Sequence, residues 1–242
     1  MACADKDYYD QGVAEHNIRP FVDDIAVYLG NWAAERRRWY SGRDDVRVLE
    51  LGAGSCALSF LLSKEPWMAE IVAGDISPAR CEQIRPHVQE MFGGDPAKVT
   101  FAELDFNEPL PFPDGHFDLV AMDGALHHSR AIWFTIGEIH RVLKPGGRFV
   151  AQREQFLAVL TYRLKLARLL ETEEVQAGVS ENAYFPAQYA YYLRAGGFDP
   201  EFKAVYPSWK FRFAAVLNGW IFAKYNIFAQ RANEVARPAG LS

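Results

Sequence analysis

One glycine turn constrains the fold of this chain more than any other feature of its sequence. The apolar run Val48-Leu49-Glu50-Leu51 leads directly into Gly52-Ala53-Gly54-Ser55, and a helical pattern follows. Glycine has no Cβ, so such a turn can bend sharply and bring the backbone N–H groups of a helix start against a ligand. The spacing Gly52-x-Gly54-x-x-Ala57 also satisfies the dinucleotide-binding fingerprint, so the turn alone leaves the ligand open.

The apolar pattern around this turn predicts an α/β fold. Runs of strand length alternate with helical patterns from Val46 to Val150, which indicates parallel strands with helical crossovers. Ser77-Pro78 offers a helix N-cap followed by a proline, and Gly93-Gly94 ends that helix. We therefore expect a doubly wound, Rossmann-like domain with helices on both faces of a mostly parallel sheet, whose first five strands cover 46–51, 70–75, 98–104, 117–122 and 147–152.

The segments outside this core predict additional helices and two more strands. Helical patterns cover 18–40, 154–174 and 186–195, the last of which stops at Gly196-Gly197. Strands over 198–206 and 224–231 would complete a seven-stranded sheet. The aromatic-rich segment 207–222 between them has no assignable structure.

A length of 242 residues favours a single domain over the whole chain, 1–242. Within it we expect an N-terminal helical cap over 1–43, a cofactor-binding core over 44–152, and substrate-side insertions with the final strands over 153–242.

Composition excludes several classes of function. The net charge of -5 disfavours nucleic acid as a partner. The three cysteines form no Cys-x-x-Cys pair, so neither a disulfide framework nor a zinc site is indicated. The chain shows no basic start followed by an apolar run and no apolar stretch of membrane-spanning length. We expect a cytoplasmic protein without stable membrane insertion.

Acidic residues stand at the ends of three successive predicted strands. Glu50 closes the first strand, Asp75 closes the second, and Asp105 follows the third. These ends meet at one edge of a parallel sheet, beside the point where the strand order reverses. Any one of them alone is equally typical of a solvated strand end.

Three acids beside a glycine turn suit a cationic nucleoside better than a dinucleotide. S-adenosylmethionine carries a sulfonium and an ammonium group, whereas Glu50 would repel a pyrophosphate at its turn. Asp75 can accept hydrogen bonds from both ribose hydroxyls, and Asp105 can accept one from the adenine amino group.

The order of these motifs resembles that of the class I S-adenosylmethionine-dependent methyltransferase superfamily, in particular its small-molecule members. The similarity covers 44–152 and rests on the glycine turn, Ala73-Gly74-Asp75-Ile76-Ser77, Leu104-Asp105-Phe106, and the runs 110–128 and 141–149. One departure is Cys56, which replaces a third glycine common in the family. Because Cys is small and commonly buried, we expect little effect.

The resemblance implies a methyltransferase that uses S-adenosylmethionine and modifies an O, N or C nucleophile of a small molecule. It also implies the residues that hold the cofactor: Glu50, Gly52, Ala53, Gly54, Asp75, Ile76, Asp105 and Phe106, with Asp123 and Gly124 on the methionine side. Two alternatives stay open, a cyclase or binding module that binds the cofactor without methyl transfer, and a nicotinamide-dependent oxidoreductase.

Histidines at the end of the fourth predicted strand are the candidates for proton transfer. A hydroxyl acceptor near neutral pH needs a general base, and His127 or His128 could serve, with His16 as a second candidate. Packing beside the cofactor is an equally good role for either. No spaced ligand motif predicts a metal site, although His127, His128 and Asp123 could form one.

The acceptor pocket is expected outside the matched core, where aromatic residues are frequent. They suit an apolar or ring-containing acceptor, although packing in the core or in a homodimer contact is the more common role of any one of them. The residues concerned are Tyr8, Tyr9, Phe156, Tyr162, Tyr184, Phe185, Tyr189, Tyr192, Trp209, Phe211, Phe213 and Trp220.

Overall fold

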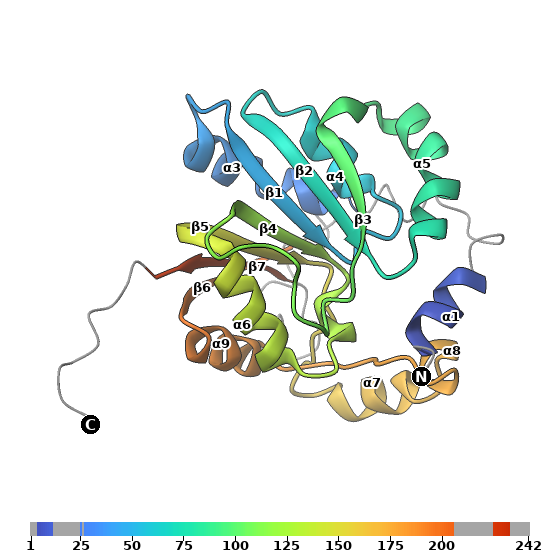
Figure 1. Cartoon of the computed structure of the whole chain (residues 1–242). Coiled ribbons are helices and arrows are strands. Elements are labelled where there is room, and N and C mark those ends of the chain that lie inside the picture. Colours follow the sequence, from blue (N-terminus) through green and yellow to red (C-terminus); the bar gives the residue numbers. More distant parts are fainter. Residues whose placement is uncertain (1–3, 12–24, 26, 206–224, 233–242) are drawn as a thin grey trace.

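The computed structural model describes residues 4–11, 25, 27–205 and 225–232. Its centre is a seven-stranded sheet with the order β3-β2-β1-β4-β5-β7-β6 (Figure 1). The first five strands pair in parallel, and β7 runs antiparallel to both of its neighbours. The strands are β1 (Val46–Leu51), β2 (Met68–Asp75), β3 (Val99–Glu103), β4 (Phe117–Asp123), β5 (Leu143–Gln152), β6 (Phe198–Ala204) and β7 (Tyr225–Arg231).

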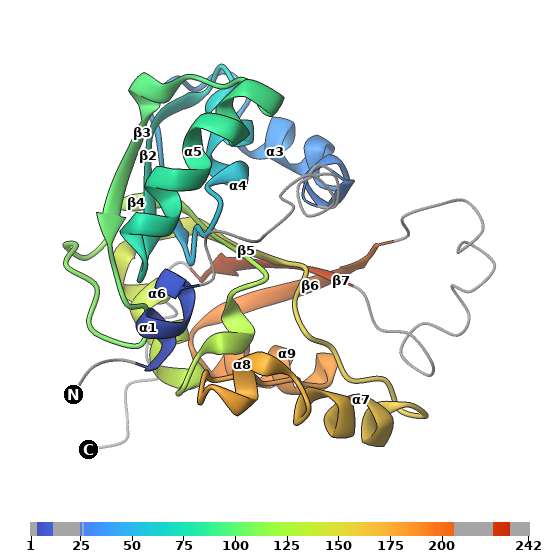
Figure 2. The same ribbon diagram turned by 90° about the vertical axis from the view of Figure 1, so that its right-hand side faces the viewer.

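Helices cover both faces of this sheet (Figures 1 and 2). One buried apolar cluster joins the sheet to α3 (Ala33–Tyr40), α4 (Ala57–Ser63) and α5 (Pro78–Phe92). The other joins the opposite face to α6 (Ile132–Val142) and α9 (Pro186–Ala195). Outside these layers lie α1 (Ala4–Gln11), α7 (Tyr162–Leu169), α8 (Glu173–Gln176) and the 3₁₀ turns η2 (Pro96–Lys98) and η3 (Leu126–His128).

Strand periodicity and register explain why one edge of the sheet carries the site. Val48 packs into the first cluster and Leu49 into the second, because successive side chains of a strand point to opposite faces. At the end of β1, Leu51 pairs with Gly74 of β2 and Met122 of β4. The carboxyl ends of three neighbouring strands therefore stop at the same level.

The predicted doubly wound, seven-stranded sheet is confirmed, and β1 and α9 have the predicted bounds. The helix predicted over 154–174 is wrong at its start, since helix begins only at Tyr162 and is interrupted before Glu173. Arg153 has a φ of 57° and turns the chain, and the Glu154 side chain then turns inward to bond the backbone at η3, which is distant in sequence.

Several predictions fall outside the described residues. They include residues 18–24 of the N-terminal helical segment, His16 and the aromatic segment 207–222. Of the segment predicted as helix over 18–40, residues 27–30 and 33–40 are helical.

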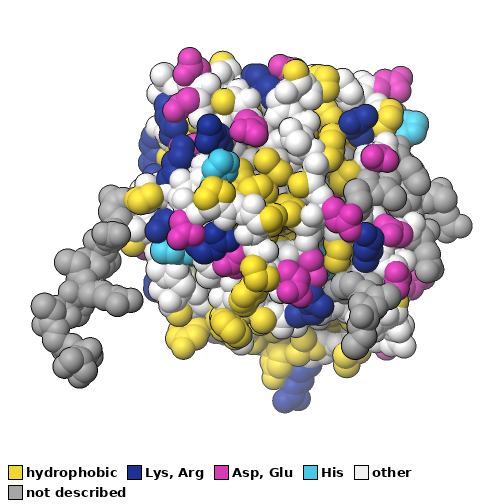
Figure 3. All heavy atoms as spheres, viewed as in Figure 1, with side chains coloured by type: hydrophobic (Ala, Val, Ile, Leu, Met, Phe, Trp, Pro, Cys, Tyr) yellow, Lys and Arg dark blue, Asp and Glu magenta, His cyan; other side chains and the backbone are white. Residues whose placement is uncertain are grey.

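Within the described ranges, no helix combines the length and the apolar character that crossing a bilayer would require. On the face drawn in Figure 3, Lys and Arg side chains are scattered among acidic and hydrophobic ones.

Candidate functional site

A cavity of about 380 Å³ opens at the carboxyl ends of β1, β2 and β4. All but one of the predicted site residues line it: Gly52, Ala53, Gly54, Asp75, Ile76, Asp105, Phe106, Asp123, Gly124, His127 and His128. Glu50 is the exception. The cavity wall also includes residues of α1 and of the segment after β5, notably Tyr8, Tyr9, Arg153, Val179 and Glu181.

The glycine turn after β1 is shaped so that a side chain at Gly52 would not fit. Gly52 has a φ of +70°, and a Cβ there would lie 2.6 Å from the Ala125 Cβ and 3.4 Å from Phe106 Cε1. The Ala53 N–H donates to the Gly74 carbonyl at 3.0 Å, which fastens the turn to β2. Only glycine therefore allows this close approach of turn and cavity wall.

Asp75 holds the same turn from the end of β2. Its Oδ2 accepts the Gly54 N–H at 2.7 Å, and its Oδ1 accepts the Ser77 N–H at 2.9 Å. The side chain is buried at the cavity wall. Because a carboxylate oxygen can accept more than one hydrogen bond, this placement is compatible with the predicted contact to ribose hydroxyls.

Glu50 lies beneath the turn and does not line the cavity. Its carboxyl is 1% exposed and accepts a hydrogen bond from the Ser59 hydroxyl of α4. Burial, with the nearby charges of Asp123 and Asp75, raises the pKa of Glu50 to about 8. A neutral Glu50 at pH 7 supports the turn from below and exerts no repulsion on a pyrophosphate, which removes one part of the electrostatic argument made from the sequence.

Cys56, which stands where many family members have glycine, has a backbone conformation that favours glycine. The residue is fully buried, but its φ is +59°, a left-handed conformation that costs a non-glycine residue about 1 kcal/mol. A hydrogen bond with Cys81, together with burial, raises the pKa of its thiol. A glycine at this position would adopt the same backbone without strain. The sequence analysis considered only the volume of the Cys56 side chain and so missed this backbone strain.

Arginines pair with two of the other acids that line the cavity, Asp105 and Asp123. Arg130 donates to Asp105 Oδ2 at 2.7 Å, while the Asn107 N–H bonds Oδ1. Arg153 holds Asp123 through two hydrogen bonds of 2.7 Å each, one to each oxygen. Sequence analysis missed Arg153, whose position directly after β5 was the available signal.

His127 is held at the other end of the cavity by a buried glutamate. Its Nδ1 lies 2.7 Å from Glu154 Oε2, and Glu154 also accepts the backbone N–H groups of Ala125, Leu126 and His127. A carboxylate bound by three backbone donors accepts the imidazole proton as well, so Nδ1 carries the hydrogen and Nε2 faces the cavity. Glu154 follows β5 and obeys the same strand-end rule as the predicted acids.

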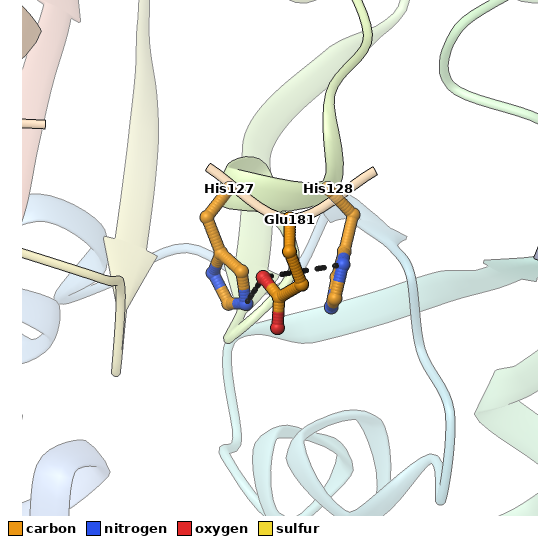
Figure 4. A group of neighbouring side chains, drawn as sticks. All are labelled: His127, His128 and Glu181. Atoms are coloured by element: carbon orange, nitrogen blue, oxygen red, sulfur yellow. Dashed lines mark ion pairs between the residues drawn. The ribbon is translucent and has the colours of Figure 1, made fainter. Parts of the chain in front are cut away.

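His128 and Glu181 complete this end of the cavity (Figure 4). His128 Nδ1 lies 2.9 Å from the Ser180 carbonyl, and its Nε2 lies 3.4 Å from the Tyr9 hydroxyl of α1. Glu181 Oε2 lies 3.5 Å from His127 Nε2 and 3.7 Å from His128 Nδ1. Burial raises the pKa of Glu181. Nothing in the sequence marked Glu181, which lies far from the matched motifs.

The remaining described histidines lie outside the cavity wall. His87 is exposed on α5 and His140 packs edge-on against Phe198, with ring centroids 5.4 Å apart. His116 packs against Phe117.

Comparison with known proteins gives a consistent result. Residues 49–151 match the methyltransferase domain family. The demethylmenaquinone methyltransferase of Symbiobacterium thermophilum is 56% identical over 150 residues, which cover 56% of this chain and 58% of that protein. The 2-phytyl-1,4-naphtoquinone methyltransferase of Synechococcus elongatus is 31% identical over 137 residues, covering 54% and 58%.

A solved structure extends the likeness of the fold. Phosphoethanolamine N-methyltransferase 2 of Haemonchus contortus, in complex with S-adenosyl-L-methionine, has a TM-score of 0.64 at 16% identity and covers 97% of this chain and 61% of that one. The chain spans little more than half the length of the two curated relatives described above. The matched domain, the relatives and the fold agree: residues 49–151 of this chain match a methyltransferase domain, and the fold around them is similar to that of S-adenosylmethionine-dependent methyltransferases.

Proposed function

We propose that this chain transfers the methyl group of S-adenosylmethionine to an oxygen, nitrogen or carbon nucleophile of a small, ring-containing molecule. One observation carries the proposal: a single cavity is lined both by the glycine turn with Asp75 and by His127 and His128. We assign residues 44–152 to the cofactor and the flanking regions, 1–43 and 153–242, to the acceptor.

The residues at the β1 and β2 ends fit the cofactor. Gly52, Ala53 and Gly54 line the cavity with their main chain, and the absence of a Cβ at Gly52 lets this turn pack directly against Ala125. Asp75 would accept the ribose hydroxyls and Asp105 the adenine amino group, while Ile76 and Phe106 pack against the rings. The cofactor supplies a methyl group activated by a sulfonium, so the protein has mainly to align the acceptor and exclude water.

The histidine end fits an acceptor that loses a proton. Glu154 fixes the His127 imidazole so that Nε2 presents its lone pair to the cavity, as a general base requires. Tyr8, Tyr9 and Val179 supply apolar surface in the wall of the same cavity. The relatives whose names specify a demethylmenaquinone or a naphthoquinone support a ring-containing acceptor.

Calorimetry with S-adenosylmethionine, S-adenosylhomocysteine and NAD tests the cofactor assignment. We expect tight binding of the first two ligands and none of NAD. Asp75→Ala should weaken cofactor binding by about 1 to 3 kcal/mol, since a buried acceptor of ligand hydrogen bonds is lost. Asp114→Ala, which removes an exposed carboxyl outside the cavity, is the matched control and should bind normally.

Release of S-adenosylhomocysteine in the presence of a panel of ring compounds, including a 1,4-naphthoquinone, tests turnover. Binding without methylation of any acceptor would favour a cyclase or binding module. Tight binding of NAD with no affinity for S-adenosylmethionine would instead favour an oxidoreductase and refute the proposal.

A further inference from the structure

Three side chains at the acceptor end of the cavity are arranged as metal ligands are. His127, His128 and Glu181 each offer one ligand atom, and these atoms all lie within 4.8 Å of one another. In Figure 4 the two imidazoles flank the Glu181 carboxylate, which points between them. All three residues line the cavity. We call them the His-His-Glu cluster.

His127 has the environment of a metal-bound histidine. Its Nδ1 donates to the buried Glu154 carboxylate at 2.7 Å, which leaves Nε2 as the ligand atom. Metal-bound histidines commonly give their other N–H to a carboxylate or a carbonyl in this way. His127 Nε2 lies 3.5 Å from Glu181 Oε2. Two ligands at about 2.0 to 2.2 Å from one tetrahedral ion are separated by roughly that distance.

His128 gives its other ring N–H to a backbone carbonyl, as some metal-bound histidines do. The Ser180 carbonyl can only accept a hydrogen bond, so the 2.9 Å contact places the ring hydrogen on Nδ1. Nε2, which lies 3.4 Å from the Tyr9 hydroxyl, is then the nitrogen of His128 that is left for an ion. Both imidazoles therefore have a fixed tautomer that presents Nε2 as a lone-pair donor.

Glu181 supplies the observation that points to a cation. Its side chain is only 9% exposed, and Oε2 has no hydrogen-bond partner among the described residues. A buried carboxylate oxygen without a donor is costly, whereas a cation bound to Nε2 of His127 and Nε2 of His128 would satisfy it. Asp123, which the sequence offered as a third ligand, is instead held by Arg153.

We propose that His127, His128 and Glu181 bind a divalent transition-metal ion of the Zn²⁺ class, with a coordination position open to the cavity. Two histidines and one carboxylate form a ligand set typical of catalytic zinc, which keeps its fourth position for water or substrate. Two imidazole nitrogens disfavour Mg²⁺ and Ca²⁺, which select oxygen ligands.

This site also defines the acceptor, and that step rests on the proposed function. An acceptor hydroxyl bound at the open position would have its pKa lowered by the ion. Its O–H bond would break with the electron pair left on oxygen and the proton passed to water. That oxygen would then bond the methyl carbon while the carbon–sulfur bond breaks and its electron pair stays on the sulfur of S-adenosylhomocysteine. His127 then serves as a ligand and not as the base, and the acceptor class is a hydroxylated ring compound.

Zinc binding to the full chain, stripped with a chelator, tests the site without cofactor or acceptor. Calorimetry with ZnCl₂ should give one ion per chain, and Glu181→Gln should weaken the affinity at least about 10-fold. Glu171→Gln, an exposed glutamate just after α7, and His87→Gln are matched controls and should bind like the wild type. Circular dichroism of each variant checks folding, and His128→Gln provides a second test if Glu181→Gln does not fold.

X-ray absorption at the zinc edge identifies the ligands. Nitrogen and oxygen neighbours at about 2.0 to 2.1 Å, lost in the cluster variants, are the expected result. Sulfur neighbours at about 2.3 Å would assign the ion to cysteines and overturn the proposal. Absence of stoichiometric binding, or equal affinity in Glu181→Gln, would overturn it as well.

The two proposals fail separately. If S-adenosylmethionine binds and zinc does not, the metal site is refuted and the methyltransferase function stands. If zinc binds and S-adenosylmethionine does not, the function is refuted and the metal site stands. Methylation of a carbon or nitrogen acceptor at an undiminished rate in the zinc-free protein would refute the hydroxyl assignment alone.

Discussion

The buried Glu50 makes the stability of this protein depend on pH in an unusual direction. Its carboxyl lies under the glycine turn, 1% exposed, with the Ser59 hydroxyl as its donor. Burial raises its pKa from an ordinary 4.5 to about 8. Between these two values the folded protein keeps a proton that the unfolded chain has lost.

The size and sign of the effect follow from this difference in bound protons. The free energy of unfolding falls as pH rises from 4.5 towards 8, by up to about 1.4 kcal/mol per pH unit. Above pH 8 the carboxyl is ionised in both states and the loss levels off. Between pH 6 and pH 8 the expected loss is about 2 kcal/mol.

Glu50→Gln should remove this loss, because the amide stays neutral and its oxygen can still accept the Ser59 hydrogen bond. Urea unfolding at pH 6, 7, 8 and 9 measures it as the difference between variant and wild type, which should grow by about 2 kcal/mol between pH 6 and pH 8. Glu90→Gln, an exposed glutamate on α5, controls for the loss of a carboxylate and should show no such growth. A difference for Glu50→Gln that is constant across the series would refute the buried, protonated carboxyl.

Three other substitutions probe the cavity and its support. Gly52→Ala should reduce cofactor affinity at least about 10-fold in calorimetry, because the new Cβ would lie 2.6 Å from the Ala125 Cβ at a φ of +70°; normal affinity would show that the turn adapts. Glu154→Gln should lower the methylation rate more than it raises KM, since it weakens the hold on the His127 tautomer, and an unchanged pH–rate profile would contradict this role. Trp32→Phe should destabilise the fold by about 1 to 3 kcal/mol in urea, because the buried Gln152 Oε1 loses its 3.0 Å donor, and unchanged stability would mean that this oxygen finds another.

Local signals made most of the fold predictable. The glycine turn, the cap at Ser77-Pro78 and the stop at Gly196-Gly197 each fix a boundary through the conformations of a few neighbouring residues. The predicted bounds of β1 and α9 match the structure for this reason. The helix predicted over 154–174 failed because its periodicity continues through residues whose conformation is set by a distant partner, the backbone of η3.

The predicted site residues likewise follow local signals in the sequence, whereas the missed residue Glu181 depends on a contact with a residue distant in sequence. The acids and glycines that line the cavity follow a rule about strand ends, which can be read along the chain. Arg153 directly follows β5 and could have been found by this rule, whereas Glu181 has no such rule. Glu181 contacts His127 because the segment after α8 folds back to the cavity. Neither secondary-structure propensity nor the spacing of motifs in the sequence predicts this tertiary contact.

The charges around the cavity are more balanced than the sequence suggests, and this changes the reason for cofactor selectivity. Of the four acids near the cofactor end, Glu50 is buried and protonated near pH 7, while Asp105 and Asp123 are paired with Arg130 and Arg153. A surplus of negative charge therefore cannot be what selects a sulfonium over a pyrophosphate. Selectivity would have to come from placement: acceptor oxygens of Asp75 at the turn, a main chain that only glycine can bring so close, and a bidentate arginine that sets where Asp123 faces the cavity.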